Sequence, residues 1–184
     1  LRAMLQNPRK RELEQASFTL LYGGMSLAAL THLTRHRMQS LAAPDLLRAA
    51  RYERYVLPES VVSAGMEARY REAFSLAEQA AQKLRTLGAG EDVLPYLLVS
   101  GLKVPVVSTM NAGELVTFFR LRTCDRAQWE IRELAAEALR VLREAHPVLF
   151  SLYGPTCFMT GACPEGKMCC GKTQQMREKF SGAL

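Results

Sequence analysis

Two short segments of the chain concentrate side chains that can hold a ligand. The first is Arg35-His36-Arg37, with Ser40 three residues later, and the second begins at Arg122. An arginine guanidinium is a planar fork that binds a phosphate through two hydrogen bonds and also stacks on a flat ring. The two segments are therefore candidates for holding a phosphate-bearing or planar ligand.

Both segments also have a purely structural interpretation. Basic residues such as Arg35-His36-Arg37 stabilise the C-terminus of a helix by complementing its dipole. Arg122 could pack along its aliphatic stem, and Trp129 and Ile131 beyond it could be core residues.

The cysteines form a second group that can do chemistry. Four of the five fall within 14 residues near the C-terminus: Cys157, Cys163, Cys169 and Cys170. Thiolates this dense in an intracellular chain favour a metal over a disulfide, although the spacing differs from the usual pair of Cys-x-x-Cys knuckles. We expect a structural zinc site; an iron–sulfur cluster, a redox disulfide and unliganded reduced cysteines in a mobile tail are the alternatives. Cys124 stands alone, and we expect it to be a packing residue.

Local patterns predict the elements that position the first segment. Residues 17–22 alternate as a strand does, and Gly23-Gly24 should end it. Ser26 is a good N-cap for a helix over residues 27–37, which would place His32, Arg35 and His36 on one face. Residues 40–60 form a predicted loop, and residues 45–55 within it could form a short helix.

The second half of the chain is predicted in the same way. Apolar periodicity predicts a helix over residues 60–87, and residues 93–98 and 103–110 are extended. Asn111 should cap a helix that runs to about Leu121, with Glu114 reaching back in a capping box. Residues 125–128 repeat this device and open a helix that Pro147 ends, with Ile131, Leu134, Ala138, Val141 or Leu142, and Ala145 as its buried face. Strands mixed with long helices, without regular alternation, predict an α+β fold in which a mixed sheet packs with long helices.

Length and composition limit the possibilities further. The 184 residues suit one domain, predicted over 1–150, with a Cys-rich C-terminal appendage over 151–184. A content of 48% apolar and 23% charged residues excludes wholesale disorder, and no apolar run approaches the roughly 20 residues that span a membrane. With no secretory signal, a cytoplasmic location is expected, and the missing initiating Met suggests a processed form or a piece of a longer chain.

Charge favours anionic partners. The formal net charge is +6, which attracts nucleotides or folate. No nucleic-acid-reading motif is present, so nucleic acid is not an expected partner. The sequence also lacks a Gly-rich phosphate loop, a Ser-His-Asp order and a His-Glu-x-x-His string.

Taken together, the two segments resemble the hallmarks of the flavin-dependent thymidylate synthase family. That family has an Arg-His-Arg-x-x-Ser run, followed later by Asn-Ala and by a Leu-Arg…Ala-Gln-Trp-Glu-Ile-Arg region. Here the run begins at Arg35, Asn111-Ala112 follows, and Leu121-Arg122 precedes the string that starts at Ala127. The resemblance covers about residues 10–150.

The resemblance implies an activity and a set of contacts. The activity is reductive methylation of dUMP to dTMP, in which FAD is recharged by NADPH and methylenetetrahydrofolate supplies the carbon. Flavin contacts would come from Arg35, His36, Arg37 and Asn111. Contacts to dUMP would come from Arg35, Ser40 and Arg122, and Arg122 would orient the pyrimidine. Family members are expected to be homotetramers whose sites are shared between subunits.

Several positions depart from the family pattern. Its Asn, second Ser and Arg-Tyr are replaced by Ala42, Asp45, Leu47 and Arg48, although Arg51-Tyr52 and Arg54-Tyr55 follow. Glu91 stands where the family has a phosphate-binding Arg, and Gly113 stands where an Arg follows Asn-Ala.

These departures leave three hypotheses open. The chain is a working synthase whose nucleotide site is rebuilt by Arg51, Arg54 or a neighbouring subunit. Alternatively, it is a degenerate, non-catalytic domain that binds flavin or scaffolds an active partner in a tandem or oligomeric enzyme. The third hypothesis is a metal or redox module built on the cysteines, which uses the fold only for assembly.

Overall fold

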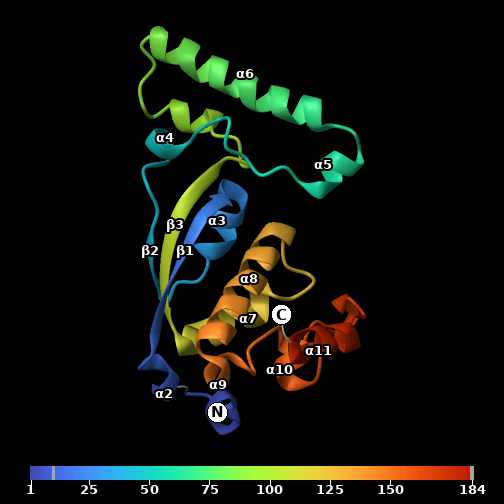
Figure 1. The fold of residues 1–184 in the computed structure, drawn as a ribbon. Coiled ribbons are helices and arrows are strands. Elements are labelled where there is room, and N and C mark those ends of the chain that lie inside the picture. The colour runs from blue at the N-terminus through green and yellow to red at the C-terminus, as the bar shows by residue number, and fades with distance from the viewer. Residues whose placement is uncertain (10, 183–184) are drawn as a thin grey trace. The chain divides into compact units, whose positions relative to one another are not determined.

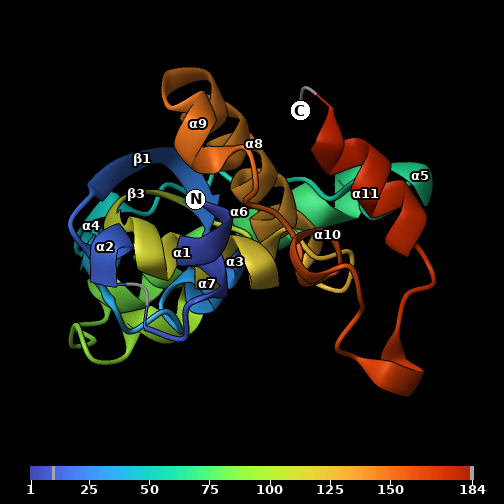
Figure 2. The ribbon, with the colours of Figure 1, turned by 90° about the horizontal axis from the view of Figure 1, so that it is seen from below.

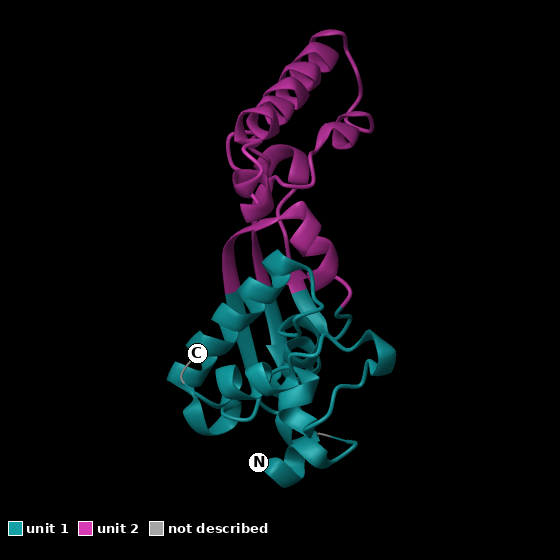
Figure 3. Cartoon of the chain, turned by 90° about the vertical axis from the view of Figure 1, so that its right-hand side faces the viewer, with its two compact units in different colours: residues 1–20, 36–40, 108–184 teal, residues 21–35, 41–107 magenta. Residues whose placement is uncertain are grey.

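A computed structural model describes residues 1–9 and 11–182, which form two compact units (Figure 3). Unit 1 comprises residues 1–20, 36–40 and 108–184, and unit 2 comprises residues 21–35 and 41–107. The Cys-rich appendage predicted over 151–184 falls within unit 1, and its last two residues lie outside the described part of the chain. The domain boundary near residue 150 stays a prediction.

Three strands form one sheet in the order β1-β3-β2. They are β1 (Ser17–Ser26), β2 (Gln39–Ala42) and β3 (Lys103–Asn111). Along β3, Val104, Val106, Ser108 and Met110 are buried, whereas the residues between them are exposed or partly exposed. This period of two gives the sheet one covered face and confirms the predicted strand at 103–110. With the helices described below, the sheet confirms the α+β fold.

The first strand is longer than predicted. Gly23-Gly24 lie inside β1 and do not end it, so that part of the prediction was wrong. A glycine within a strand is tolerated where pairing with a neighbouring strand continues, and β1 pairs with β3.

Unit 1 holds most of the helices, and α7 and α8 lie side by side in it (Figure 1). Its helices are α1 (Arg2–Gln6), α2 (Arg11–Glu14), α7 (Ala112–Arg122), α8 (Trp129–Ala145), α9 (Pro147–Phe150), α10 (Thr156–Thr160), the 3₁₀ turn η2 (Gly166–Met168) and α11 (Thr173–Ser181). Its core is aromatic: Phe118, Phe119, Phe150 and Tyr153 are all fully buried.

The start of α8 differs from the prediction. Gln128 is the N-cap, since its side chain accepts a hydrogen bond from the Ile131 amide at 2.9 Å. The carboxylate of Asp125 instead pairs with Arg132 at 3.4 Å and with Lys172 at 2.9 Å. The predicted end before Pro147 is confirmed.

The buried face of α8 was predicted in part. Ile131, Ala138 and Leu142 are buried as predicted. Leu134 is only half-buried, and Val141 and Ala145 are exposed. Ala145 is the last residue of α8, and its side chain is exposed at that end of the helix.

The residues beyond 150 pack against α8. Arg143 of α8 donates to the Tyr153 carbonyl at 2.8 Å, and its guanidinium lies 5.9 Å from the rings of Phe158 and Phe180. A Cβ on Gly154 would lie 2.8 Å from Phe158, so this glycine allows the close approach. The Cys-rich segment therefore packs against α8 as part of unit 1.

Unit 2 is built around a small aromatic core. Its helices are α3 (Leu27–Leu33), α4 (Leu46–Ala49), α5 (Glu59–Ser63), α6 (Glu67–Thr86) and the 3₁₀ turn η1 (Leu94–Leu97). The predicted Ser26 cap is confirmed by a 3.0 Å hydrogen bond from Ala29, and α4 confirms the short helix within 45–55. The rings of Tyr55 and Phe74 stack at 4.4 Å in the core.

Two predictions for unit 2 were wrong. The single helix expected over 60–87 is divided into α5 and α6, because Gly65 adopts a positive φ of 66° that no helix accommodates. Residues 93–98 are not extended but contain η1, where Pro95 stands in the first turn. No helix among residues 1–9 and 11–182 is long and apolar enough to cross a membrane.

Candidate functional site

The Arg35-His36-Arg37 segment lies in the connection after α3 and not on it. The helix ends at Leu33, so the prediction that His32, Arg35 and His36 share a helix face was wrong. The Gln39 side chain donates to the His36 carbonyl at 2.7 Å and closes the turn that leads into β2. Ser40, expected in a loop, lies exposed in β2.

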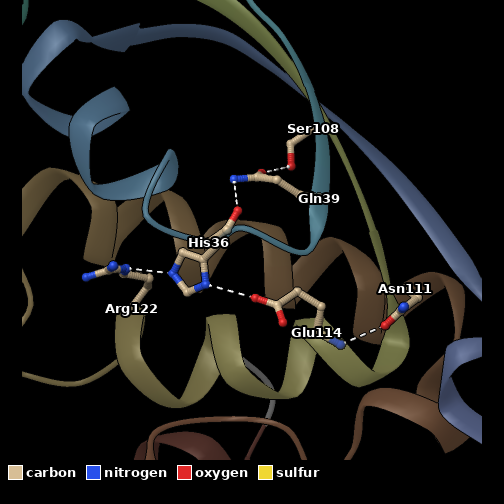
Figure 4. Close-up of polar contacts among 6 residues, drawn as sticks. All are labelled: His36, Gln39, Ser108, Asn111, Glu114 and Arg122. Atoms are coloured by element: carbon tan, nitrogen blue, oxygen red, sulfur yellow. Dashed lines mark hydrogen bonds and ion pairs between the residues drawn. The ribbon is translucent and has the colours of Figure 1, made fainter. Parts of the chain in front are cut away.

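His36 is the centre of a hydrogen-bond network within unit 1 (Figure 4). Its side chain is buried, with a residue exposure of 5%. Nε of Arg122 donates to Nε2 of His36 at 3.0 Å, and Nδ1 of His36 lies 3.1 Å from Oε1 of Glu114. Both ring nitrogens of His36 are therefore engaged inside the protein.

This arrangement fixes the protonation state of the ring. Because Nε2 accepts from Arg122, its lone pair is free of a proton, and the single proton lies on Nδ1 facing Glu114. Burial, followed by the positive charge of Arg122, lowers the pKa of His36 from 6.5 to about 4. His36 is thus a neutral imidazole near pH 7, and its contact with Glu114 is a hydrogen bond to a carboxylate.

One face of α7 carries the partners of His36. Glu114, Phe118 and Arg122 are spaced by four residues, which places them along one side of the helix. The His36 and Phe118 rings meet edge to face at 5.2 Å. Burial raises the pKa of Glu114 above its usual value. The helix therefore presents a carboxylate, a ring and a guanidinium along His36.

The cap of α7 was predicted correctly only in part. The Asn111 side chain accepts from the Glu114 amide at 2.8 Å, as predicted. The Glu114 carboxylate, however, does not reach back to Asn111 but binds His36. The capping box was wrong because a buried imidazole competes for the carboxylate.

Sequence reasoning missed Glu114, Gln39 and Ser108 as parts of this site. Ser108 of β3 is buried and donates to Oε1 of Gln39 at 2.8 Å, and Gln39 in turn holds the His36 carbonyl. In the sequence, only the four-residue spacing of Glu114, Phe118 and Arg122 indicates that these side chains share one face of a helix. The Gln39 contacts join strands and could not be inferred from spacing.

The other residues expected to hold a ligand present free donors. Arg35 and Arg37 are exposed, and within the described chain neither makes a hydrogen bond or an ion pair. Asn111 uses its carbonyl oxygen as the cap, which leaves the amide NH₂ as a donor. These groups have the donor chemistry that phosphates and a flavin ring require.

Three residues at or near the departures from the family pattern, Asp45, Arg51 and Glu91, lie in unit 2. Asp45 caps α4 by accepting from Leu47 at 2.9 Å. Arg51 donates through Nη1 to the carbonyls of Arg48 and Ala50 at 2.7 and 3.0 Å. Glu91 is exposed.

The cysteines gather around one cavity of unit 1. Cys124, Cys157, Cys163 and Cys170 line a cavity of about 550 Å³ together with Arg122. All five cysteines are reduced. Nowhere in residues 1–9 and 11–182 are three or more His, Cys, Asp or Glu side chains placed to hold a metal ion, so the zinc site on Cys157, Cys163, Cys169 and Cys170 stays a prediction.

Comparison with known proteins identifies the family of this chain. The Thy1 family model, described as thymidylate synthase complementing protein, matches residues 1–148. A flavin-dependent thymidylate synthase of Geobacter sulfurreducens is 41% identical over 176 residues, covering 91% of this chain and 74% of that protein. One from Clostridium tetani is 32% identical over 199 residues, covering 98% of this chain and 79% of the relative.

A solved structure shares the fold. The crystal structure of thymidylate synthase X from Helicobacter pylori with FAD and dUMP matches at a TM-score of 0.62 and 22% identity, covering 81% of this chain and 78% of that one. With the family model and the sequence relatives, these findings establish that the chain belongs to the flavin-dependent thymidylate synthase family.

Proposed function

We propose that this chain binds FAD and methylates dUMP reductively to dTMP. Its relatives are named flavin-dependent thymidylate synthases, and the similar solved structure contains FAD and dUMP. The observation that carries the proposal is the buried His36, which holds Arg122 by a 3.0 Å hydrogen bond. A neutral imidazole is costly to bury unless both nitrogens are partnered. Here the hydrogen bonds to Glu114 and Arg122 offset the cost of burying His36, and they also fix the Arg122 guanidinium. A fixed guanidinium suits a residue that orients a substrate.

The flavin would be held by Arg35, Arg37 and Asn111. The two guanidiniums can bind the FAD pyrophosphate, and the Asn111 amide can donate to a ring carbonyl. Bound FAD, once reduced by NADPH, would supply the hydride that passes to the uracil ring. His36 belongs to the proposed flavin site too, but its ring nitrogens are engaged by Glu114 and Arg122, so we propose that it positions Arg122.

The nucleotide would be held by Arg35, Ser40 and Arg122. Arg122 is proposed to orient the pyrimidine, because its guanidinium is held from the side by His36. Ser40 is exposed in β2 and can donate to a phosphate. NADPH and methylenetetrahydrofolate are the proposed co-substrates.

We also propose a homotetramer, located in the cytoplasm. Support comes from the uncovered face of the sheet, where Leu21 of β1 is 71% exposed and Val107 of β3 is 37% exposed. Apolar side chains on an open sheet face are typical of surfaces that pair with another subunit.

A non-catalytic scaffold is the second candidate, and the folding of residues 42–54 favours it. Arg51 could have rebuilt the phosphate contact, but it is bound to two carbonyls of its own loop. The cavity that Arg51 and Arg85 share also contains Glu53 and Glu78, whose charges oppose a phosphate.

Ligand titration separates the candidates. Binding of FAD is measured by flavin fluorescence, and Arg37→Ala should weaken it about tenfold or more, the loss of one charge-assisted hydrogen bond. Arg71→Ala is the matched control, since Arg71 is an exposed arginine of α6 paired with Glu67. The chain with FAD is then titrated with dUMP in a calorimeter.

The outcomes differ between the candidates. Heat that saturates with dUMP supports the synthase. Flavin binding without any dUMP heat at millimolar nucleotide supports the scaffold, and absence of flavin binding contradicts the synthase.

A further inference from the structure

Another cavity of unit 1 lies on a different side of α7 from His36. It has a volume of about 850 Å³, and residues of α1, α7 and α10 line it; we call it the arginine cavity. Figure 2 shows α1 close to α7, and both helices contribute residues to the cavity. From α7 come Val116 and Arg120, each two residues after Glu114 and Phe118, respectively. Residues two apart on a helix do not share a face, so the cavity is not part of the His36 network.

The positive charge of the arginine cavity is not balanced. Its charged lining residues are Arg2 and Arg120, and no Asp or Glu of the described residues lines it. Nε of Arg120 donates to the Thr156 hydroxyl at 3.5 Å, which leaves both NH₂ groups of the guanidinium without a partner among the described residues. Arg2 is exposed and makes no hydrogen bond or ion pair within the described chain. Two guanidiniums with donors to spare favour an anionic ligand.

Other arginine-lined cavities of the chain contain acidic residues. The cavity that Arg51 lines contains Glu53 and Glu78. The cysteine-lined cavity contains Asp125 and Glu165. Carboxylates at these distances oppose an anion, so the arginine cavity attracts an anion more strongly than either of them.

The rest of the lining is largely apolar. Val116 is buried, and Leu152, Phe158 and Met159 are half-buried along the cavity. Apolar side chains that are still partly in contact with water gain free energy when a ligand covers them. A volume of about 850 Å³ also lies within the range of about 300–1,000 Å³ that is typical of small-molecule sites. The ligand therefore needs an apolar body as well as a negative charge.

Much of the apolar wall lies outside the part of the chain that defines the family. The family model matches residues 1–148, whereas Leu152, Phe158 and Met159 follow it. A ligand bound here makes no use of the residues proposed to hold FAD and dUMP.

We propose that the arginine cavity binds a small amphipathic monoanion, namely a carboxylate on an alkyl or aromatic body. The carboxylate accepts hydrogen bonds from Arg120 and Arg2, and the apolar body covers Leu152, Phe158 and Met159. A singly charged carboxylate suits a partly apolar cavity better than a phosphate dianion does, because burying the second charge costs more.

The first test uses the full chain without any variant. The probe is anilinonaphthalene sulfonate, a fluorescent apolar ring system with one negative charge. We expect its fluorescence to rise to saturation at one site per chain, and decanoate or naphthoate to displace it. The better competitor of the two identifies the ligand body as alkyl or aromatic.

Two further competitors separate charge from apolar contact. Decyltrimethylammonium has an alkyl body with the opposite charge, and inorganic phosphate has the charge without the body. Neither should displace the probe at the concentration at which the carboxylate does. Equal displacement by either one, or the absence of saturable probe binding, overturns the proposal.

Three variants locate the bound probe. Arg2→Gln and Arg120→Gln should each weaken probe binding about tenfold, the loss of one charge-assisted hydrogen bond. Arg126→Gln is the matched control, because Arg126 is an exposed arginine that lines the cysteine-lined cavity and not the arginine cavity. Since Arg120 lines both cavities, Arg2→Gln decides between them. Binding that is weakened by Arg126→Gln and unchanged by Arg2→Gln would place the probe in the cysteine-lined cavity and contradict the proposal. Circular dichroism confirms that each variant is folded.

Discussion

Arg122 donates from Nε to Nε2 of His36 at 3.0 Å, and this bond joins residues 86 positions apart in the sequence. It links the two segments that carry the family resemblance (Figure 4). A buried neutral histidine thus fixes one guanidinium, and Glu114 in turn fixes the histidine. The position of the Arg122 guanidinium therefore depends on both His36 and Glu114.

Removing the imidazole should destabilise unit 1. His36→Ala leaves the half-buried Glu114 carboxylate without its donor and opens a gap beside Phe118, at a cost of about 2–4 kcal/mol. Glu114→Gln keeps an oxygen that can accept from Nδ1, so it should cost less than about 1 kcal/mol. Urea unfolding of both variants measures the difference. Equal costs would contradict the described network, because Glu114→Gln keeps the hydrogen bond that His36→Ala removes.

Acid should weaken the fold through His36. Below pH 6.5 the unfolded chain protonates this residue, whereas the folded chain does so only near its lowered pKa of about 4. The free energy of unfolding should therefore fall between these values as pH is lowered, by at most about 3 kcal/mol. The raised pKa of Glu114 acts in the opposite sense, so the unfolding free energy is measured against pH in the Glu114→Gln background.

The positive charge of Arg122 should have a measurable effect on the pKa of His36. In Arg122→Gln the pKa of His36 should rise, because the second cause of its lowering is removed, yet it should stay below 6.5 because burial persists. Titration by NMR of the labelled imidazole tests this. Arg126→Gln is the control and should leave the His36 pKa unchanged.

Two buried tyrosines should respond oppositely to loss of the hydroxyl. The Tyr22 hydroxyl is buried and has no hydrogen-bond partner among residues 1–9 and 11–182, so Tyr22→Phe should leave stability unchanged or raise it by about 1 kcal/mol. The Tyr153 hydroxyl donates to the Ala112 carbonyl at 3.1 Å, so Tyr153→Phe should lower stability by about 1 kcal/mol. Thermal unfolding of the two variants compares their stabilities. A larger loss of stability in Tyr22→Phe than in Tyr153→Phe would contradict the structure.

A single methyl group tests the packing of the C-terminal segment. In Gly154→Ala the new Cβ would lie 2.8 Å from Phe158 and 3.2 Å from Phe180, so we expect a loss of about 1–3 kcal/mol. Gly23→Ala is the control, because nothing lies within 4 Å of its Cβ. If both variants unfold at the same urea concentration, Gly154 does not pack against Phe158 and Phe180 as described.

The sequence predicted the elements whose signals are local. Ser26 and Asn111 cap helices, as their residue types indicated, and the alternation in 103–110 is a strand. Gly65, which divides the helix predicted over 60–87, is also a local feature, but the apolar periodicity continues on both sides of it. The short helices beyond residue 150 were hidden by a composition rich in Cys, Gly and Pro.

The candidate site was harder to predict because its contacts are long-range. Arg122 was identified through the resemblance, but nothing in the spacing indicated that it binds His36. Glu114 was assigned to its nearest backbone amide, since a capping box is the local alternative. Glu114 binds His36 instead, because the fold buries His36 beside it. The burial of a single histidine cannot be predicted from its neighbours in the sequence.

Formation of dTMP tests the central claim most directly. The purified chain is supplied with FAD, NADPH, methylenetetrahydrofolate and dUMP, and dTMP is quantified by chromatography. The account predicts dTMP that depends on all four additions and that Arg122→Gln reduces about tenfold or more, the loss of one orienting contact. No dTMP from a chain that has bound FAD would contradict it.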